Sequence, residues 1–250
     1  MENTQENKVL LITGGFSDFG VTIINSIYDD FDMIFLHCSH SPERYIEYGL
    51  KELDVSNKIN ILTFDFNSGE DVQNMVIKLK GYDKKITHFI HLPSPSLQLK
   101  KFVKISLSDF DKFYNVSFRS CVAILQYLLP TMVENKKGNI IIMLSDSIKG
   151  ETPSYCSNYI STKYALWGLV NSLAVEYSEF GININAISPG TTNTKFFGKQ
   201  GRMVLANNAK NSRIKRNLET YEIVGTVKYL FSSNAKSVSG NNIFINGGVK

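Results

Sequence analysis

The chain has 250 residues, of which 43% are hydrophobic and 20% are charged, so it can bury a sizeable core without a metal or disulfides. Its net charge of +4 suits an anionic ligand but is too small to indicate a nucleic-acid-binding surface. The three cysteines have no metal-ligand spacing, the first residues are polar, and no segment predicts a membrane span. We therefore expect a cytoplasmic protein with reduced thiols.

Apolar runs alternate with stretches of helical periodicity along the chain. The runs predicted to be strands are 8–13, 33–38, 59–64, 87–92, 139–144, 182–187 and 242–245. The stretches predicted to be helices are 20–28, 42–55, 72–79, 108–132, 154–180 and 219–231, with Ser108 or Asp109 capping the fourth. This alternation predicts a single α/β domain over residues 1–250, with a doubly wound parallel sheet between two layers of helices.

A glycine-rich turn, Thr13–Gly20, follows the first predicted strand. Glycines there let the backbone approach a pyrophosphate, and the N-terminus of the next helix favours its negative charge. An ordinary tight turn is the alternative. Asp18 stands at a position that is usually a third glycine. The predicted cofactor-binding residues of this turn are Gly14, Phe16, Ser17, Asp18, Phe19 and Gly20.

The end of the second predicted strand favours NADP over NAD as the cofactor. An acidic residue there would bind the adenosine 2′-hydroxyl of NAD, and none is present. Ser39, His40 and Ser41, together with Arg44, would instead surround a 2′-phosphate. Asp65, at the end of the third strand, would accept a hydrogen bond from the adenine amino group or cap the following helix.

Tyr159 and Lys163 are four residues apart, so on a helix their side chains share one face. A free tyrosine has a pKa of about 10, and a nearby ammonium favours the phenolate and lowers that value. Tyr159 would then exchange a proton with a substrate. Ser145 and Asp146 end the preceding apolar run and would lie near this pair, although Asp146 also suits a helix cap or a loop hydrogen bond.

Taken together, these motifs resemble the short-chain dehydrogenase/reductase family over the whole chain. The matching pieces are ThrGly to Gly at 13–20, Asp65, AsnVal to Pro at 115–130, Tyr159 with Lys163, and ProGly at 189–190 with Thr194. The resemblance implies a nicotinamide cofactor, a small-molecule substrate and a homotetramer. It also implies cofactor contacts from Phe66, Leu92, Pro93, Ser94, Tyr159, Lys163, Pro189, Gly190, Thr192 and Thr194.

Within that family the chain looks most like pteridine reductases and dihydromonapterin (alternative dihydrofolate) reductases. Asp146 stands where most members have a catalytic serine and pteridine reductases an aspartate. LeuHisCysSerHisSer at 36–41 and Ser94 also resemble that group. If the alignment shifts by one residue, Ser145 becomes the ordinary catalytic serine.

Two departures from the family pattern concern proton relay. HisLeuProSer at 91–94 replaces AsnAsnAlaGly, and Ser117 replaces the asparagine that helps to hold a relay water. The predicted catalytic residues are therefore Tyr159, Lys163, Asp146, Ser145 and Ser117.

The leading hypothesis is an NADPH-dependent reductase of a dihydropterin C=N bond, with a mobile substrate lid at about 191–218. One alternative is a keto-group reductase, for example of a 3-oxoacyl thioester, in which Ser145 polarises the oxygen. A second alternative is a non-catalytic cofactor sensor that keeps the fold.

Overall fold

The computed structural model describes residues 7–40 and 58–248. The predicted helix at 42–55 lies outside the described residues, as do Ser41 and Arg44.

Seven parallel strands form one sheet in the order β3-β2-β1-β4-β5-β6-β7. The strands are β1 Val9–Thr13, β2 Met33–Cys38, β3 Ile59–Thr63, β4 His88–His91, β5 Gly138–Met143, β6 Ile182–Pro189 and β7 Asn242–Ile245. The order reverses on either side of β1, which pairs with both β2 and β4. This topology confirms the predicted doubly wound sheet, and it brings the carboxyl ends of all strands to one edge.

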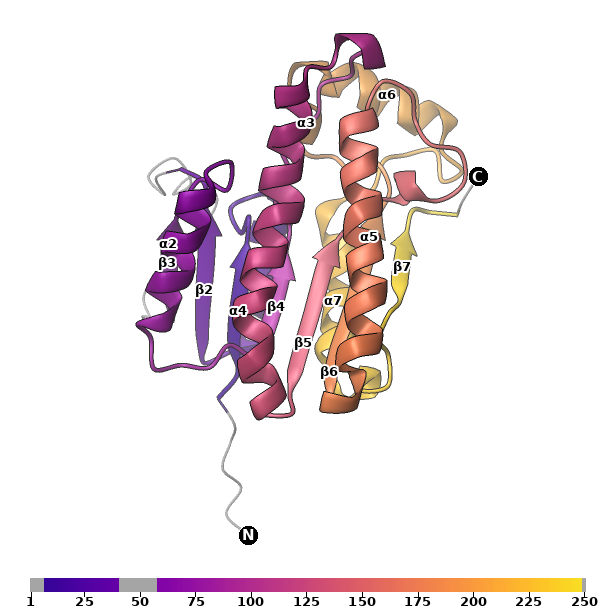
Figure 1. Cartoon of the computed structure of the whole chain (residues 1–250). Coiled ribbons are helices and arrows are strands. Elements are labelled where there is room, and N and C mark those ends of the chain that lie inside the picture. Colours follow the sequence, from indigo (N-terminus) through magenta and orange to yellow (C-terminus); the bar gives the residue numbers. More distant parts are fainter. Residues whose placement is uncertain (1–6, 41–57, 249–250) are drawn as a thin grey trace.

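Helices cover both faces of the sheet (Figure 1). The helices are α1 Asp18–Ile27, α2 Gly69–Lys80, α3 Leu107–Phe113, α4 Ser120–Glu134, α5 Ser157–Tyr177, α6 Gly201–Asn211 and α7 Val224–Phe231. Helices α2, α4 and α5 pack on one face around Phe35, Leu62 and Phe89, whereas α1 and α7 pack on the other. The strands are buried on both faces, which explains their continuous apolar runs.

The predicted helix at 108–132 is divided into three parts. A π-helix, Tyr114–Arg119, separates α3 from α4. The N-cap is Ser106 and not Ser108 or Asp109; Ser106 Oγ accepts from the Asp109 N–H, and the Asp109 carboxylate accepts from the Ser106 N–H. This reciprocal pair is a capping box, in which Asp109 occupies the third helical position.

The continuous helical stretch Leu107–Glu134 has the length and mean hydropathy (1.4) of a possible membrane span, which the sequence reading did not expect. In the structure 44% of the most apolar 18-residue segment of this stretch is buried. Core helices of globular proteins pass the same test, and α4 packs Ile124, Leu128 and Met132 into the core beneath the sheet. Packing against the sheet thus accounts for the apolar composition.

The predicted lid contains a helix that the sequence did not reveal. Residues Lys195–Gln200 form a 3-10 turn and Gly201–Asn211 form α6, which lies above the carboxyl ends of the strands (Figure 1). Few residues of α6 are buried, so the sequence has no apolar stripe that would predict it. A parallel β-bridge between Thr192 and Leu218 joins the two ends of the predicted lid.

Three buried histidines, His37, His88 and His91, lie on the central strands β2 and β4. Burial lowers the pKa of His37 to about 4 and the pKa values of His88 and His91 to about 3. All three imidazoles are therefore neutral near pH 7, because burial disfavours the charged form and outweighs the opposing Asp65 charge near His37.

Replacing His88 should change how stability depends on pH. Its folded pKa lies below the unfolded value of about 6.5, so its contribution is complete above pH 6.5 and is lost as pH falls toward 3. The His88 ring meets Phe31 and Phe231 edge-on, which suits phenylalanine as a replacement. Between pH 6.5 and 4.5, the free energy of unfolding should fall by roughly 2 kcal/mol less in His88→Phe than in the wild type. The measurement is urea unfolding at both pH values. Equal losses in the two proteins would contradict this assignment.

Candidate active site

A cavity of about 580 Å³ lies along the carboxyl ends of β1, β2, β4 and β5. It runs from the glycine-rich turn to Tyr159 and Lys163 on α5, and the lid forms part of its wall. Predicted residues that line it are Gly14, Phe16, Ser17, Asp18, Phe19, Ser39, His40, Asp65, Phe66, Leu92, Pro93, Ser94, Tyr159, Lys163 and Thr194. The elements that the sequence assigned to a dinucleotide site therefore meet in one cavity.

Other predicted residues are not among those that line this cavity. They are Gly20, Ser117, Ser145, Asp146, Pro189, Gly190 and Thr192. Thr192 is buried and its hydroxyl donates to the Gly190 carbonyl at 2.9 Å, while the Gly190 N–H donates to Ile245 at the end of β7. These contacts shape the segment that follows β6. Of the four predicted residues there, Pro189, Gly190, Thr192 and Thr194, Thr194 alone lines the cavity.

The backbone of the glycine-rich turn has the form that a phosphate cradle needs. Gly14 has a φ of +68°, a left-handed conformation that favours glycine. A Cβ on Gly20 would lie 2.3 Å from the Gly15 carbonyl oxygen, so only glycine allows α1 to start this close to the turn. Ser17 caps α1 by accepting from the Gly20 N–H at 3.2 Å. The turn and helix N-terminus thus fit a pyrophosphate.

His37 supports this turn, a role that the sequence reading missed. The Gly14 N–H donates to Nδ1 at 3.2 Å, so Nε2 carries the proton and donates to the Phe64 carbonyl at 2.9 Å. The ring stacks on Phe66, with centroids 3.8 Å apart and planes 8° apart. His37 therefore joins the ends of β1, β2 and β3 and itself lines the cavity. The sequence signal for this role was the position of His37 in HisCysSerHisSer, at the end of the second predicted strand and next to the predicted cofactor site.

Asp18 and Asp65 accept hydrogen bonds from backbone groups that the sequence did not predict. The Asp18 carboxylate accepts from the Lys195 N–H of the lid at 2.8 Å. The Asp65 carboxylate accepts from the Asn67 N–H at 2.9 Å within a turn, and Ser68 caps α2, so the helix-cap interpretation of Asp65 is wrong. Asp65 still lines the cavity, where it can accept a hydrogen bond from an adenine amino group.

Ser145 and Asp146 act on the Tyr159 hydroxyl in opposite directions: the Ser145 side chain lowers its pKa, and the Asp146 charge raises it. Ser145 begins a short 3-10 turn after β5, and its side chain also accepts from the Ser147 N–H at 3.2 Å. One carboxylate oxygen of Asp146 faces Gly190, 3.2 Å from where a Cβ on that glycine would lie. Both residues therefore influence the pKa of Tyr159, and which of them is its catalytic partner stays a prediction.

Burial raises the pKa of Tyr159 above its usual value, the Ser145 hydrogen bond opposes this effect, and the Asp146 charge adds to it. The pKa of Tyr159 is therefore raised, whereas a lowered value was expected beside Lys163. The Lys163 ammonium lies 5.7 Å from the Tyr159 ring centroid and donates to the Met143 carbonyl at 2.7 Å. Burial lowers the pKa of Lys163 to about 8. The phenol is thus a neutral proton donor near pH 7.

Ser117 lies in the π-helix and is fully buried. Its carbonyl accepts from His91 Nε2 at 2.8 Å, and His91 Nδ1 accepts from the Thr13 hydroxyl at 2.9 Å. Ser117 Oγ has no hydrogen-bond partner among the described residues. The Ser117 carbonyl is thus already engaged in a hydrogen bond with His91. The expected catalytic role of Ser117 stays a prediction.

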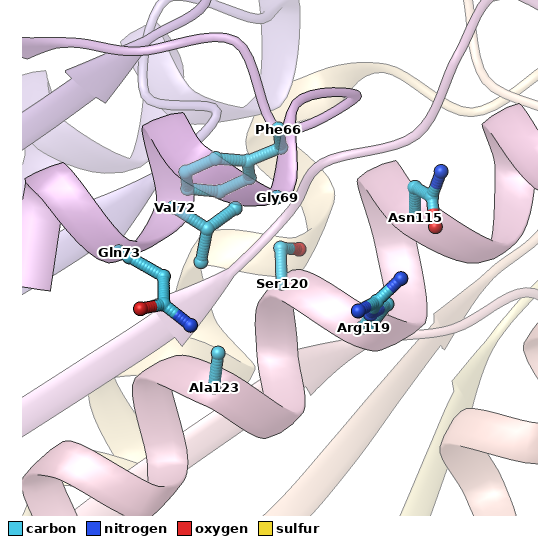
Figure 2. Close-up of a pocket in the computed structure, with 8 residues that line it drawn as sticks. All are labelled: Phe66, Gly69, Val72, Gln73, Asn115, Arg119, Ser120 and Ala123. Carbon is cyan, nitrogen blue, oxygen red and sulfur yellow. The ribbon is translucent and has the colours of Figure 1, made fainter.

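A second hollow, of about 70 Å³, lies between α2 and the start of α4 (Figure 2). Phe66 and Val72 form one side, opposite Ser120 and Ala123, and Arg119 closes one end. Phe66 lines both hollows, but this one is far too small for a dinucleotide. The larger cavity is therefore the candidate active site.

Comparisons with known proteins agree with this geometry. A family profile described as "Enoyl-(Acyl carrier protein) reductase" matches residues 34–250. Dehydrogenase/reductase SDR family member 6 of Danio rerio is 31% identical over 209 residues, covering 80% of this chain and 82% of that protein. The chain is a short-chain dehydrogenase/reductase. Membership in this family makes it an NAD(P)-dependent oxidoreductase.

Other relatives of this short-chain dehydrogenase/reductase are more distant. Acetoacetyl-CoA reductase of Allochromatium vinosum is 23% identical, covering 97% of this chain and 98% of that protein. Levodione reductase has a TM-score of 0.86 at 24% identity, covering 96% of each chain. ElxO with NADP bound has a TM-score of 0.84 at 22% identity, covering 97% and 98%. A 3-oxoacyl-[acyl-carrier protein] reductase from Brucella melitensis with bound NAD has a TM-score of 0.83 at 20% identity, covering 98% and 92%. The structural similarities show the fold.

Gly20→Ala should weaken dinucleotide binding by this short-chain dehydrogenase/reductase. The new Cβ would displace the Gly15 carbonyl and thereby move the cradle. We expect a loss of at least tenfold in NADPH affinity, measured by fluorescence titration. Gly225→Ala is the matched control, because no atom lies within 4 Å of its added Cβ. Unchanged affinity in Gly20→Ala would show that the cradle is elsewhere.

Proposed function

We propose that this protein uses NADPH to reduce a carbonyl group on a small molecule. The proposal rests on the Ser145 side chain, which acts on the Tyr159 hydroxyl so as to lower its pKa, and on the buried Lys163 ammonium, which lies 5.7 Å from the Tyr159 ring centroid. Two O–H donors that meet at one point suit a carbonyl oxygen, which accepts both as negative charge develops on it. A carboxylate at that point would repel the same oxygen.

Each residue of this group has a separate task. Ser145 donates a hydrogen bond that polarises the carbonyl, and Tyr159 transfers its proton to the oxygen. Lys163 stabilises the negative charge that the phenol acquires, because its ammonium lies within reach of the ring and is excluded from water. The bound dinucleotide would supply the hydride. The glycine-rich turn, with Asp65 and Phe66, would hold the dinucleotide along the cavity.

The names of relatives support a keto group as the target, since they include acetoacetyl-CoA reductase and 3-oxoacyl-[acyl-carrier protein] reductase. NADPH is the proposed cofactor because Ser39 and His40 line the cavity at the end of β2, where NAD-binding proteins carry a carboxylate. ElxO binds NADP, whereas the Brucella melitensis reductase binds NAD.

The dihydropterin hypothesis depends on Asp146, whose carboxylate faces Gly190. It therefore stays a secondary hypothesis. The buried Tyr159 and Lys163, together with family membership, favour an enzyme over a cofactor sensor. A homotetramer and a cytoplasmic location stay predictions.

Substitutions at three positions test the proposed roles. We expect Tyr159→Phe to lower kcat/KM for acetoacetyl thioester reduction by about 10²- to 10⁴-fold, and Ser145→Ala by about 10²-fold, because each removes a donor to the carbonyl oxygen. Asp146→Asn should change it by less than about fivefold. The measurement is NADPH oxidation, run in parallel with dihydropterin and dihydrofolate. Pterin turnover that depends on Asp146 but not on Ser145 would reverse the assignment.

The pH dependence should follow Lys163. Its folded pKa of about 8 lies below its ordinary value, so the ammonium is present below pH 8 and is lost above it. Since Tyr159 stays protonated over this range, we expect kcat/KM for reduction to fall above pH 8. Alcohol oxidation, which needs the phenolate, should rise with pH. A reduction rate that is constant to pH 9.5 would contradict the role given to the ammonium.

A further inference from the structure

Asp18 joins two parts of the site that are far apart in the chain. It is the first residue of α1, and its Oδ2 accepts from the Lys195 N–H at 2.8 Å, across 177 positions of sequence. Lys195 is the first residue of the 3-10 turn of the lid, Lys195–Gln200. Both residues line the 580 Å³ cavity. One charged side chain thus connects the glycine-rich turn with the lid.

A carboxylate is chemically suited to this place. The first N–H groups of a helix lack partners inside the helix and attract negative charge. Asp18 lies in the first turn of α1, and its oxygen accepts from the first N–H of the 3-10 turn, so two helix N-termini share one anion. Hydrogen bonds to an ionised acceptor are shorter and stronger than neutral ones. A glycine here would leave the Lys195 N–H without this acceptor.

The opposite side of the same turn is held by the loop after β4. The Leu97 N–H donates to the Phe196 carbonyl at 2.9 Å, and the Leu99 N–H donates to Gln200 Oε1 at 2.7 Å. These bonds fix the turn toward residues 97–99, while Asp18 fixes it toward the glycine-rich turn. The turn is therefore held from both sides.

Phe196 follows directly after Lys195, whose N–H donates to Asp18. Its ring lies 5.3 Å from the Tyr159 ring, at an interplanar angle of 51°. Phe196 also lines the cavity, and it packs on a buried cluster that contains Leu97, Phe113 and Cys156. Because Lys195 N and the Phe196 backbone are separated by a few bonds, the hydrogen bond from Lys195 to Asp18 sets the direction from which the Phe196 ring enters the site.

We propose that Asp18 is a positioning residue, whose carboxylate latches the 195–200 turn to the glycine-rich turn and so holds the Phe196 ring against Tyr159. Resting on the proposed function, this arrangement makes Phe196 the apolar wall beside the reacting carbonyl and shields the phenol from water. The substrate group next to the carbonyl is then apolar.

Hydrogen exchange of the free protein tests the latch without any substrate. In Asp18→Ala we expect amides of 195–200 to exchange about tenfold faster than in the wild type, by mass spectrometry. Asp18→Asn keeps an acceptor oxygen and should restore most of the protection. The matched control is Asp32→Ala, since Asp32 Oδ2 accepts from the Lys8 N–H at the same 2.8 Å near the opposite ends of the strands. Lid exchange in Asp18→Ala equal to that of the wild type would overturn the latch.

Kinetics then test whether Asp18 acts through Phe196. Asp18→Ala and Phe196→Ala should each lower kcat/KM for the carbonyl substrate by about tenfold, and the double variant should lose no more than Phe196→Ala alone. NADPH affinity should not fall in Asp18→Ala, because the change removes a negative charge beside an anion site. Additive losses, or a loss explained wholly by weaker NADPH binding, would overturn the positioning role. A wild type that turns over no carbonyl but shows the exchange result would reject the proposed function alone.

Discussion

The buried ammonium of Lys163 imposes the main constraint on the site. A cation removed from water must be satisfied, and Lys163 meets this requirement by donating to the Met143 carbonyl at the end of β5. That bond fastens α5 to the edge of the sheet. Tyr159, one helical turn earlier, is thereby placed beside Ser145, the second residue after β5. The position of the phenol thus follows from where a lysine finds its acceptor.

Neutral imidazoles secure the neighbouring strand ends. His37 accepts from the Gly14 N–H, and His91 links Thr13 to the Ser117 carbonyl. Each ring uses one nitrogen as donor and the other as acceptor, which is possible only for the neutral form. Burial keeps both rings neutral near pH 7, so the edge that carries the dinucleotide cradle depends on the histidines staying uncharged.

The choice between Ser145 and Asp146 illustrates how one residue position selects the chemistry. A hydroxyl beside the Tyr159 phenol favours an oxygen that gains negative charge, whereas a carboxylate there would favour a group that gains a proton. In the structure the Ser145 side chain lowers the pKa of the phenol and the Asp146 charge raises it, while one Asp146 oxygen lies toward Gly190. Under the proposed function, the Phe196 ring beside the phenol would favour an uncharged carbonyl compound.

Local patterns in the sequence determined most of the fold and the outline of the site. Continuous apolar runs predicted the strands, Gly14 and Gly20 predicted the cradle, and the spacing of Tyr159 and Lys163 placed both on one helix face. Helix α6, the π-helix and the Ser106 cap were missed, because a weakly amphipathic or irregular helical segment leaves no clear periodicity. Those elements were found only in the structure.

The tertiary structure alone decided what the side chains touch. That Ser145 meets Tyr159, that Lys163 bonds to a carbonyl, and that Asp18 reaches the lid depend on contacts between distant segments. Sequence periodicity specifies which face a residue occupies, but not the direction of a side chain after a strand has ended. The physical reason is that these contacts are set by how the packed sheet brings loops together at one edge.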